Sequence, residues 1–160
     1  MLSPRIFLPH YLDGALFLMR VGYAALLFGY HGWGRLMQIY NYVMLDQAWP
    51  FVGVVQKLGF PAPPVFALLS ALSEGIGTIL LALGFCTRWA AGMIAASMAV
   101  AVYSKVSKSE SFELPALYLL GAVAIAAAGA GRFSLDRFAP RFLTARTQRW
   151  QSEPRGVEID

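Results

Sequence analysis

Residues 65–86 read VFALLSALSEGIGTILLALGFC. The segment is long and apolar enough to cross a membrane, because a spanning helix needs about 20 mainly apolar residues. Glu74 lies near its middle. An acidic residue at that depth costs about 2.5 to 3.5 kcal/mol on insertion scales, so such a residue usually faces protein and has a partner. The rest of the sequence must therefore supply a partner for Glu74.

The composition is that of an integral membrane protein. Of the 160 residues, 58% are hydrophobic and 14% are charged, against roughly 25% charged in soluble domains. The net charge is +4, with basic residues concentrated after residue 131. We attribute this charge to membrane topology and lipid contact, not to nucleic acid. A single cysteine, Cys86, excludes an intramolecular disulfide and is expected to be a small apolar residue at a helix end.

Four apolar segments predict an all-α, integral membrane four-helix bundle over residues 1–138. The expected spans are residues 12–33, 65–86, 89–103 and 113–130. Most Lys and Arg residues fall on the side that carries both chain ends, so the positive-inside rule places the N and C termini in the cytoplasm. Residues 139–160 are predicted to be a basic cytoplasmic tail that lies on the membrane surface and then becomes disordered.

The connection between the first two spans is the longest in the chain. Gly32 and Gly34 are expected to end the first span, which places Arg35 outside the membrane. Within the connection, residues 42–58 carry enough apolar positions to predict an amphipathic segment on the bilayer surface.

The first span offers a partner for Glu74. At 1.5 Å per helical residue, Arg20 lies about 12 Å and Glu74 about 18 Å from the cytoplasmic ends of their spans. An arginine side chain can cover that offset, so we predict an Arg20–Glu74 ion pair. An equally weighted alternative is that this pair only fixes the packing of the helices.

Other polar residues are expected to share a pocket with this pair. His31 lies on the same helical stripe as Arg20. Tyr30, Ser70 and Glu113 complete the predicted pocket. Several proton-carrying groups together would suit a quinone headgroup, whose reduction needs two protons with two electrons. Arg20, His31 and Glu74 are then the candidate catalytic residues, which orient the headgroup or relay protons.

The histidines allow other interpretations. A hydrogen-bonded histidine at the membrane interface is favoured over a haem or metal ligand at His31. The other histidine, His10, is predicted on the opposite side of the membrane, which excludes a bis-histidine haem site in one bundle. No metal site is predicted.

Five short motifs point to a known family. They are YHGWGRL at 30–36, FP at 60–61, Glu74, LGFCTR at 83–88 and GAGRFSLD at 129–136. Together they resemble the DoxX family of small bacterial membrane proteins over about residues 12–138. By position, the residues that match the family's pattern are Arg20, His31, Gly32, Gly34, Glu74 and Arg88.

The resemblance implies a four-helix bundle that crosses the bacterial inner membrane several times and is broadly linked to oxidoreductase function. Some relatives are subunits that act at quinone pools, and others accompany responses to quinone or oxidative stress. The resemblance attaches no catalytic role to the matching residues.

Two functions follow from these observations. The first is a quinone-interacting oxidoreductase subunit whose electrons come from an electron-transfer or membrane protein partner, because no flavin, nucleotide or metal motif is recognisable. The alternative is a non-enzymatic module, either a scaffold or assembly partner or a small-solute carrier. Small residues on the third and fourth spans would then serve association with another subunit, including a second copy. The lipid bilayer is a partner in either case, and nucleic acid is not.

Overall fold

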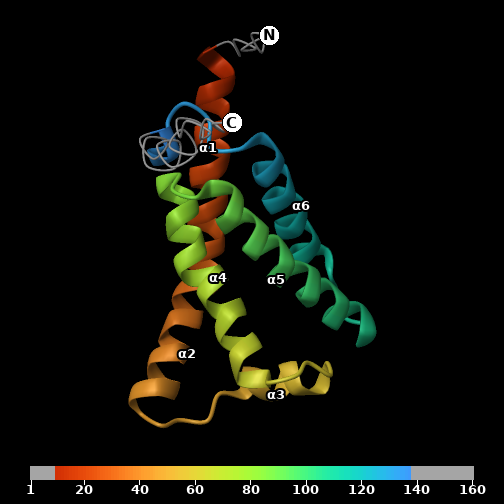
Figure 1. Cartoon of the computed structure of the whole chain (residues 1–160). Coiled ribbons are helices and arrows are strands. Elements are labelled where there is room, and N and C mark those ends of the chain that lie inside the picture. The colour runs from red at the N-terminus through yellow and green to blue at the C-terminus, as the bar shows by residue number, and fades with distance from the viewer. Residues whose placement is uncertain (1–9, 138–160) are drawn as a thin grey trace, which may run out of the picture.

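The computed structural model describes residues 10–137 and shows helices joined by short loops. The helices are α1 (His10–Leu27), η1 (Phe28–Gly32), α2 (Trp33–Met44), α3 (Pro50–Lys57), α4 (Pro63–Leu83), α5 (Thr87–Ser107), α6 (Glu113–Ala128) and η2 (Leu135–Arg137). Successive long helices run in opposite directions, so residues 10 and 137 lie at the same end of the bundle (Figure 1). We call this the terminal end, and the opposite end, which carries α3, the α3 end.

The described helices are those of a membrane protein. Three helical stretches are long and apolar enough to cross a membrane, namely Leu12–Met44, Pro63–Leu83 and Thr87–Ser107, and Glu113–Ala128 is a shorter apolar helix. The all-α membrane fold is therefore confirmed. Four crossings and cytoplasmic termini stay predictions, and the expected tail at 139–160 lies outside the described residues.

The first helix is much longer than predicted. The expected end at Trp33 is wrong, because helical structure continues without a break to Met44. Gly32 keeps right-handed helical angles, φ −60° and ψ −46°, within a π-helical turn. A Cβ added there would lie 2.6 Å from the backbone oxygen of Glu74. This glycine therefore allows close contact between two helices and does not end one.

The first helix also contacts α4 at a second glycine. A Cβ added to Gly75 would lie 2.6 Å from the side chain of Leu36. Small residues permit close approach of membrane helices, where van der Waals packing contributes much of the association. The two glycine contacts fix the height of α2 against the middle of α4.

The main apolar core lies toward the terminal end. It contains Ala24, Leu27, Leu81, Ala90, Ala91, Ile94, Met98, Ala122 and Ile125. A Cβ at Gly77 would be 3.6 Å from Ile94, so α4 and α5 pack closely at this level. Toward the α3 end the two helices diverge (Figure 1).

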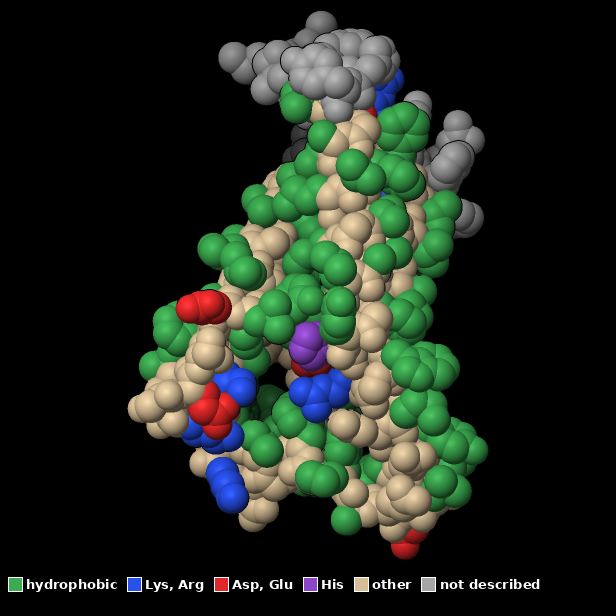
Figure 2. Space-filling view, turned by 180° about the vertical axis from the view of Figure 1, so that it is seen from behind, with side chains coloured by type: hydrophobic (Ala, Val, Ile, Leu, Met, Phe, Trp, Pro, Cys, Tyr) green, Lys and Arg blue, Asp and Glu red, His purple; other side chains and the backbone are tan. Residues whose placement is uncertain are grey.

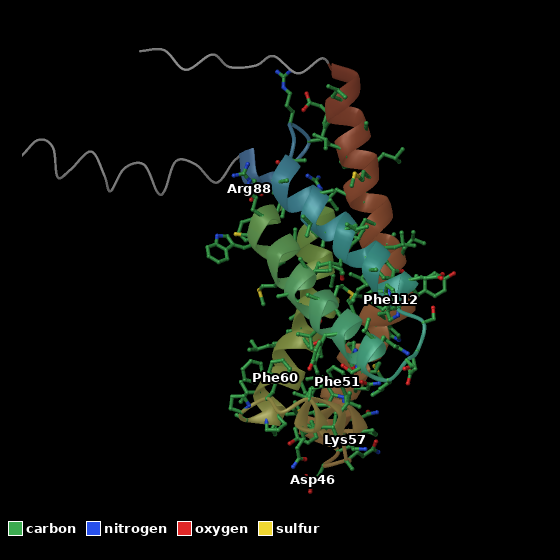
Figure 3. All side chains as sticks on the ribbon, turned by 90° about the vertical axis from the view of Figure 1, so that its right-hand side faces the viewer. Asp46, Phe51, Lys57, Phe60, Arg88 and Phe112 are labelled. Carbon is green, nitrogen blue, oxygen red and sulfur yellow. The ribbon has the colours of Figure 1, made fainter. Side chains whose placement is uncertain are left out.

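A second apolar cluster joins α3 to α4. Trp49 and Val55 pack there with Ala67 and Ala71. The predicted amphipathic segment at 42–58 is therefore only partly helical, because α3 begins at Pro50 and packs on α4. Figure 3 shows Phe51, which belongs to α3, and Phe60 at the α3 end, and Arg88 at the opposite end of the bundle.

Candidate functional site

Glu74 is held in a network of side-chain hydrogen bonds within the bundle. Only 3% of the residue is exposed. Its Oε2 accepts a hydrogen bond from Arg35 Nε over 3.1 Å, which is also a salt bridge. Its Oε1 lies 3.2 Å from Ser70 Oγ and 3.0 Å from Ser97 Oγ. The partner that Glu74 requires is therefore Arg35, supported by two serine hydroxyls.

The predicted Arg20–Glu74 ion pair is wrong. Arg20 is 2% exposed, but it donates from Nη1 to the carbonyl oxygen of Ala130 and from Nη2 to that of Phe133, the latter over 2.6 Å. Its guanidinium lies beside Gly84, where α4 finishes at the terminal end of the bundle. The loop after α6 returns to this point and supplies carbonyl groups, which the sequence alone did not place.

Arg35 was missed because Gly32 and Gly34 were interpreted as the end of the first span. The uninterrupted helix and its π-helical turn carry Arg35 to the level of Glu74. Such turns within α-helices are frequent at functional sites. The signal available in the sequence was Arg35 itself, which belongs to the YHGWGRL motif but was assigned to the water-exposed connection.

The Arg35 side chain also connects Glu74 to α3. Its guanidinium carbon lies 3.9 Å from the centre of the Phe51 ring, a cation–π contact. Arg35 Nη1 lies 3.5 Å from Gln38 Oε1, which accepts a hydrogen bond from Trp49 Nε1 over 3.0 Å. The position of α3 and the geometry of the ion pair are therefore coupled.

The two serine hydroxyls form a triangle with the carboxylate. Ser70 Oγ and Ser97 Oγ are 2.7 Å apart, and either can donate to the other. Each hydroxyl carries one proton, so only two of the three short contacts are hydrogen bonds at one time when Glu74 is ionised. The triangle can rearrange its protons without moving the heavy atoms, and a protonated Glu74 can donate to either serine.

A cavity of about 560 Å³ lies beside this network, between α3, α4 and α5. Arg35, Ser70, Ser73, Glu74 and Ser97 are its polar residues within the bundle. Its apolar lining is Phe51, Val54, Val55, Leu58, Phe60, Phe66, Leu69, Met93, Ala96, Val100 and Ala101. The lining is completed toward the α3 end by Ser104, Lys105, Lys108 and Glu110. Figure 2 shows basic, acidic and histidine side chains around a hollow on the rear face.

The family of this chain follows from a comparison of its sequence with family models. A family model described as DoxX matches residues 15–106, which is more than half of the chain. The chain belongs to the DoxX family. A comparison with curated proteins found no match, and neither did a comparison with solved structures.

Three of the other predicted site residues of this DoxX protein, His31, Tyr30 and Glu113, do not line the cavity. His31 packs edge-on against Tyr118, with ring centres 5.6 Å apart, and its buried Nδ1 has no hydrogen-bond partner among residues 10–137. Tyr30 is 78% exposed, and Glu113 is exposed at the start of α6. Of the predicted secondary pocket, Tyr30, Ser70 and Glu113, only Ser70 lines the cavity.

The described part of the DoxX chain offers no evident metal centre. Residues 10–137 contain no group of three or more His, Cys, Asp or Glu side chains that could hold a metal ion. Cys86 is exposed.

The GAGRFSLD motif binds the helix ends together at the terminal end. Asp136 accepts hydrogen bonds from the backbone N–H groups of Cys86, over 2.5 Å, and Thr87, over 2.9 Å, at the start of α5. Its own N–H donates to the carbonyl oxygen of Gly84 over 2.8 Å. Arg132 N–H donates to Asp13 on α1. In this DoxX protein the motif therefore has a structural role remote from Glu74.

Proposed function

We propose that this DoxX-family protein is an inner-membrane oxidoreductase subunit that interacts with quinone, and that the cavity beside Glu74 receives the quinone headgroup. The supporting observation is a largely apolar cavity with one buried, hydrogen-bonded carboxylate in its wall. Small-molecule pockets are mostly apolar, commonly about 300–1,000 Å³, with few polar groups that fix orientation. The cavity has this character and an adequate volume.

The residues around the cavity fit such a headgroup. A quinone oxygen can accept hydrogen bonds from hydroxyl groups, and Ser70 and Ser97 carry theirs on the cavity wall. Glu74 is the group that takes up or releases a proton, and Arg35 holds its carboxylate in place. A bound quinone supplies the two-electron chemistry, and a protein partner supplies or accepts the electrons.

This assignment changes the roles expected from the sequence. Glu74 keeps its role as a proton-carrying group. Arg20 is excluded from headgroup binding because loop carbonyl groups occupy its guanidinium. His31 is also left out, because it does not line the cavity.

Quinone titration of the protein in phospholipid bilayer discs tests the proposal. We expect saturable binding of a short-tailed benzoquinone analogue. Glu74→Gln and Ser97→Ala should weaken it about tenfold, as when good hydrogen bonds to a ligand are lost. His31→Ala is the control and should bind as the unmodified protein does. Absence of saturable binding, or equal affinities in all four proteins, would refute the proposal.

A second candidate function is assembly of a membrane complex. Gly92 is exposed on α5, and an added Cβ would have nothing within 4 Å. Ala96 and Ala99, one and two turns further on, are also exposed. Such small-residue surfaces favour helix association in membranes. If the protein serves assembly, Gly92→Leu would abolish cross-linking to a partner or a second copy. Leu120→Ala on α6 would leave the cross-linking unchanged.

A further inference from the structure

Two helix faces meet at the cavity. On α4 the lining residues are Phe66, Leu69, Ser70, Ser73 and Glu74, and on α5 they are Met93, Ala96, Ser97, Val100, Ala101 and Ser104. Both sets follow the spacing of a single helical stripe. The helices α4 and α5 pack closely at Gly77 and Ile94, are bridged by Ser70 and Ser97, and diverge toward the α3 end. The two stripes therefore face each other across an opening.

One edge of this opening is apolar and exposed. Leu69 is 47% exposed, Phe66 37% and Met93 46%, although all three line the cavity. They belong to helices that are long and apolar enough to span a membrane. We therefore expect lipid outside this edge, where the cavity lining carries no charged residue. We call this edge the α4–α5 opening.

The other side of the cavity has a different character. Lys105, Lys108 and Glu110 lie toward the α3 end, and Lys105 Nζ forms a salt bridge with Glu110 Oε2 over 2.5 Å. Desolvating charged side chains is costly. A hydrocarbon chain is therefore better accommodated at the α4–α5 opening than at this charged rim.

We propose that the ligand enters sideways from the bilayer through the α4–α5 opening, with its headgroup at Ser97 and Glu74 and its hydrocarbon tail against Leu69 and Met93. This inference rests on the proposed quinone function and names the substrate class. The substrate is a lipid-dissolved quinone with a long tail, and a water-soluble quinone lacks part of the binding surface.

Photoaffinity labelling tests the path of the tail without altering the protein. The probe is a benzoquinone with a decyl tail that carries a diazirine at its end, added to the protein in phospholipid bilayer discs. We expect labels on α4 and α5 around Leu69 and Met93. Labels confined to α3 or to residues 105–110 would overturn the inference.

Filling the opening gives a second measurement. Leu69→Trp and Met93→Trp, on opposite sides, should each weaken binding of the decyl-tailed quinone about tenfold, because buried tail surface is lost. The tail-less benzoquinone should bind within about twofold of its original affinity, a change of only a few tenths of a kcal/mol. Leu120→Trp, at a 66% exposed position on α6, is the matched control and should change neither affinity.

The outcomes separate this inference from the proposed function. If the tail-less quinone binds but the substitutions leave the tailed one unaffected, sideways access is refuted and headgroup binding stands. Equal losses for both quinones would also refute it. If neither quinone binds the unmodified protein, both proposals fail. A second copy seated on α5 would appear as intermolecular cross-links through Met93 that exclude the probe. This result would also refute sideways access.

Discussion

Arg35 Nε donates to Glu74 Oε2 over 3.1 Å and joins the long first helix to the middle of α4. The two side chains differ in exposure: 23% of the Arg35 side chain is exposed, but only 5% of the Glu74 side chain. Removal of the arginine leaves a carboxylate inside the bundle. Removal of the carboxylate leaves a cation on a flexible chain that can turn toward water. The two halves of the ion pair are therefore not equivalent.

Arg35→Leu should destabilise the protein more than Glu74→Gln. Loss of one partner from a buried pair costs about 3 to 5 kcal/mol in soluble proteins, and the partial exposure of Arg35 reduces that figure here. In a double-mutant cycle the two substitutions should show coupling of about 1 to 3 kcal/mol. The measurement is the free energy of unfolding in detergent micelles.

Arg20→Leu provides the control for this cycle. Because Arg20 contacts loop carbonyls and not Glu74, its effect should add to that of Glu74→Gln within about 0.5 kcal/mol. Strong coupling of Arg20 to Glu74, with none for Arg35, would contradict the observed pairing.

Gly32→Ala should be strongly destabilising. The new Cβ would lie 2.6 Å from the backbone oxygen of Glu74. This oxygen is part of the α4 backbone, so the clash can be relieved only if α4 itself shifts. Overpacking of this kind costs about 1 to 3 kcal/mol. Thermal unfolding would measure the effect.

Gly34→Ala is the matched control for Gly32, two residues away in the same helix. Nothing lies within 4 Å of its added Cβ, so it should be neutral or gain up to about 1 kcal/mol from reduced chain entropy. Equal loss in both variants would mean that general helix effects, and not contact with α4, explain Gly32.

Asp136→Ala should loosen the start of α5. The substitution removes the acceptor for the N–H groups of Cys86 and Thr87. Loss of such a cap costs about 0.5 to 2 kcal/mol. Hydrogen exchange should accelerate at residues 86–90, while Asp136→Asn, which retains one acceptor oxygen, should have a smaller effect. Unchanged exchange in the alanine variant would contradict the capping role.

Glu110 should titrate below the usual carboxyl range. The hydrogen bond from Lys105 lowers the pKa of this exposed carboxyl group, with a further contribution from the Lys105 charge. A lowered folded-state pKa means that the contact stabilises the fold above the unfolded-state pKa and is lost as the pH falls through the folded-state value. Lys105→Met should raise the pKa in an NMR titration, and Lys108→Met should raise it less. The same pKa in all three proteins would refute the contact in solution.

Local composition was sufficient for much of the fold. The predicted second span, residues 65–86, corresponds to α4 at Pro63–Leu83, and the third and fourth predicted spans correspond to α5 and α6. The prediction of a buried, partnered Glu74 also followed from its position in an apolar helix. These features depend on hydropathy and segment length, which the sequence states directly.

The partner of Glu74 depended on longer-range structure. Only Arg20 was a candidate in the sequence, because Gly32 and Gly34 were expected to end the first span before Arg35, and the path of the loop after α6 could not be derived from the sequence. That loop places the carbonyl groups of Ala130 and Phe133 on Arg20, whereas contact at Gly32 brings Arg35 to Glu74. Neither relationship is visible in local sequence periodicity.

The sequence by itself determined a helical membrane protein of the DoxX family with a costly acidic residue in one crossing, because hydropathy and short motifs are properties of contiguous residues. Only the tertiary structure decided that Gly32 joins helices, that Arg35 neutralises Glu74, and that Ser97 completes the network beside a cavity. These contacts depend on helix height, rotation and divergence, which arise from the packing of segments distant in the chain.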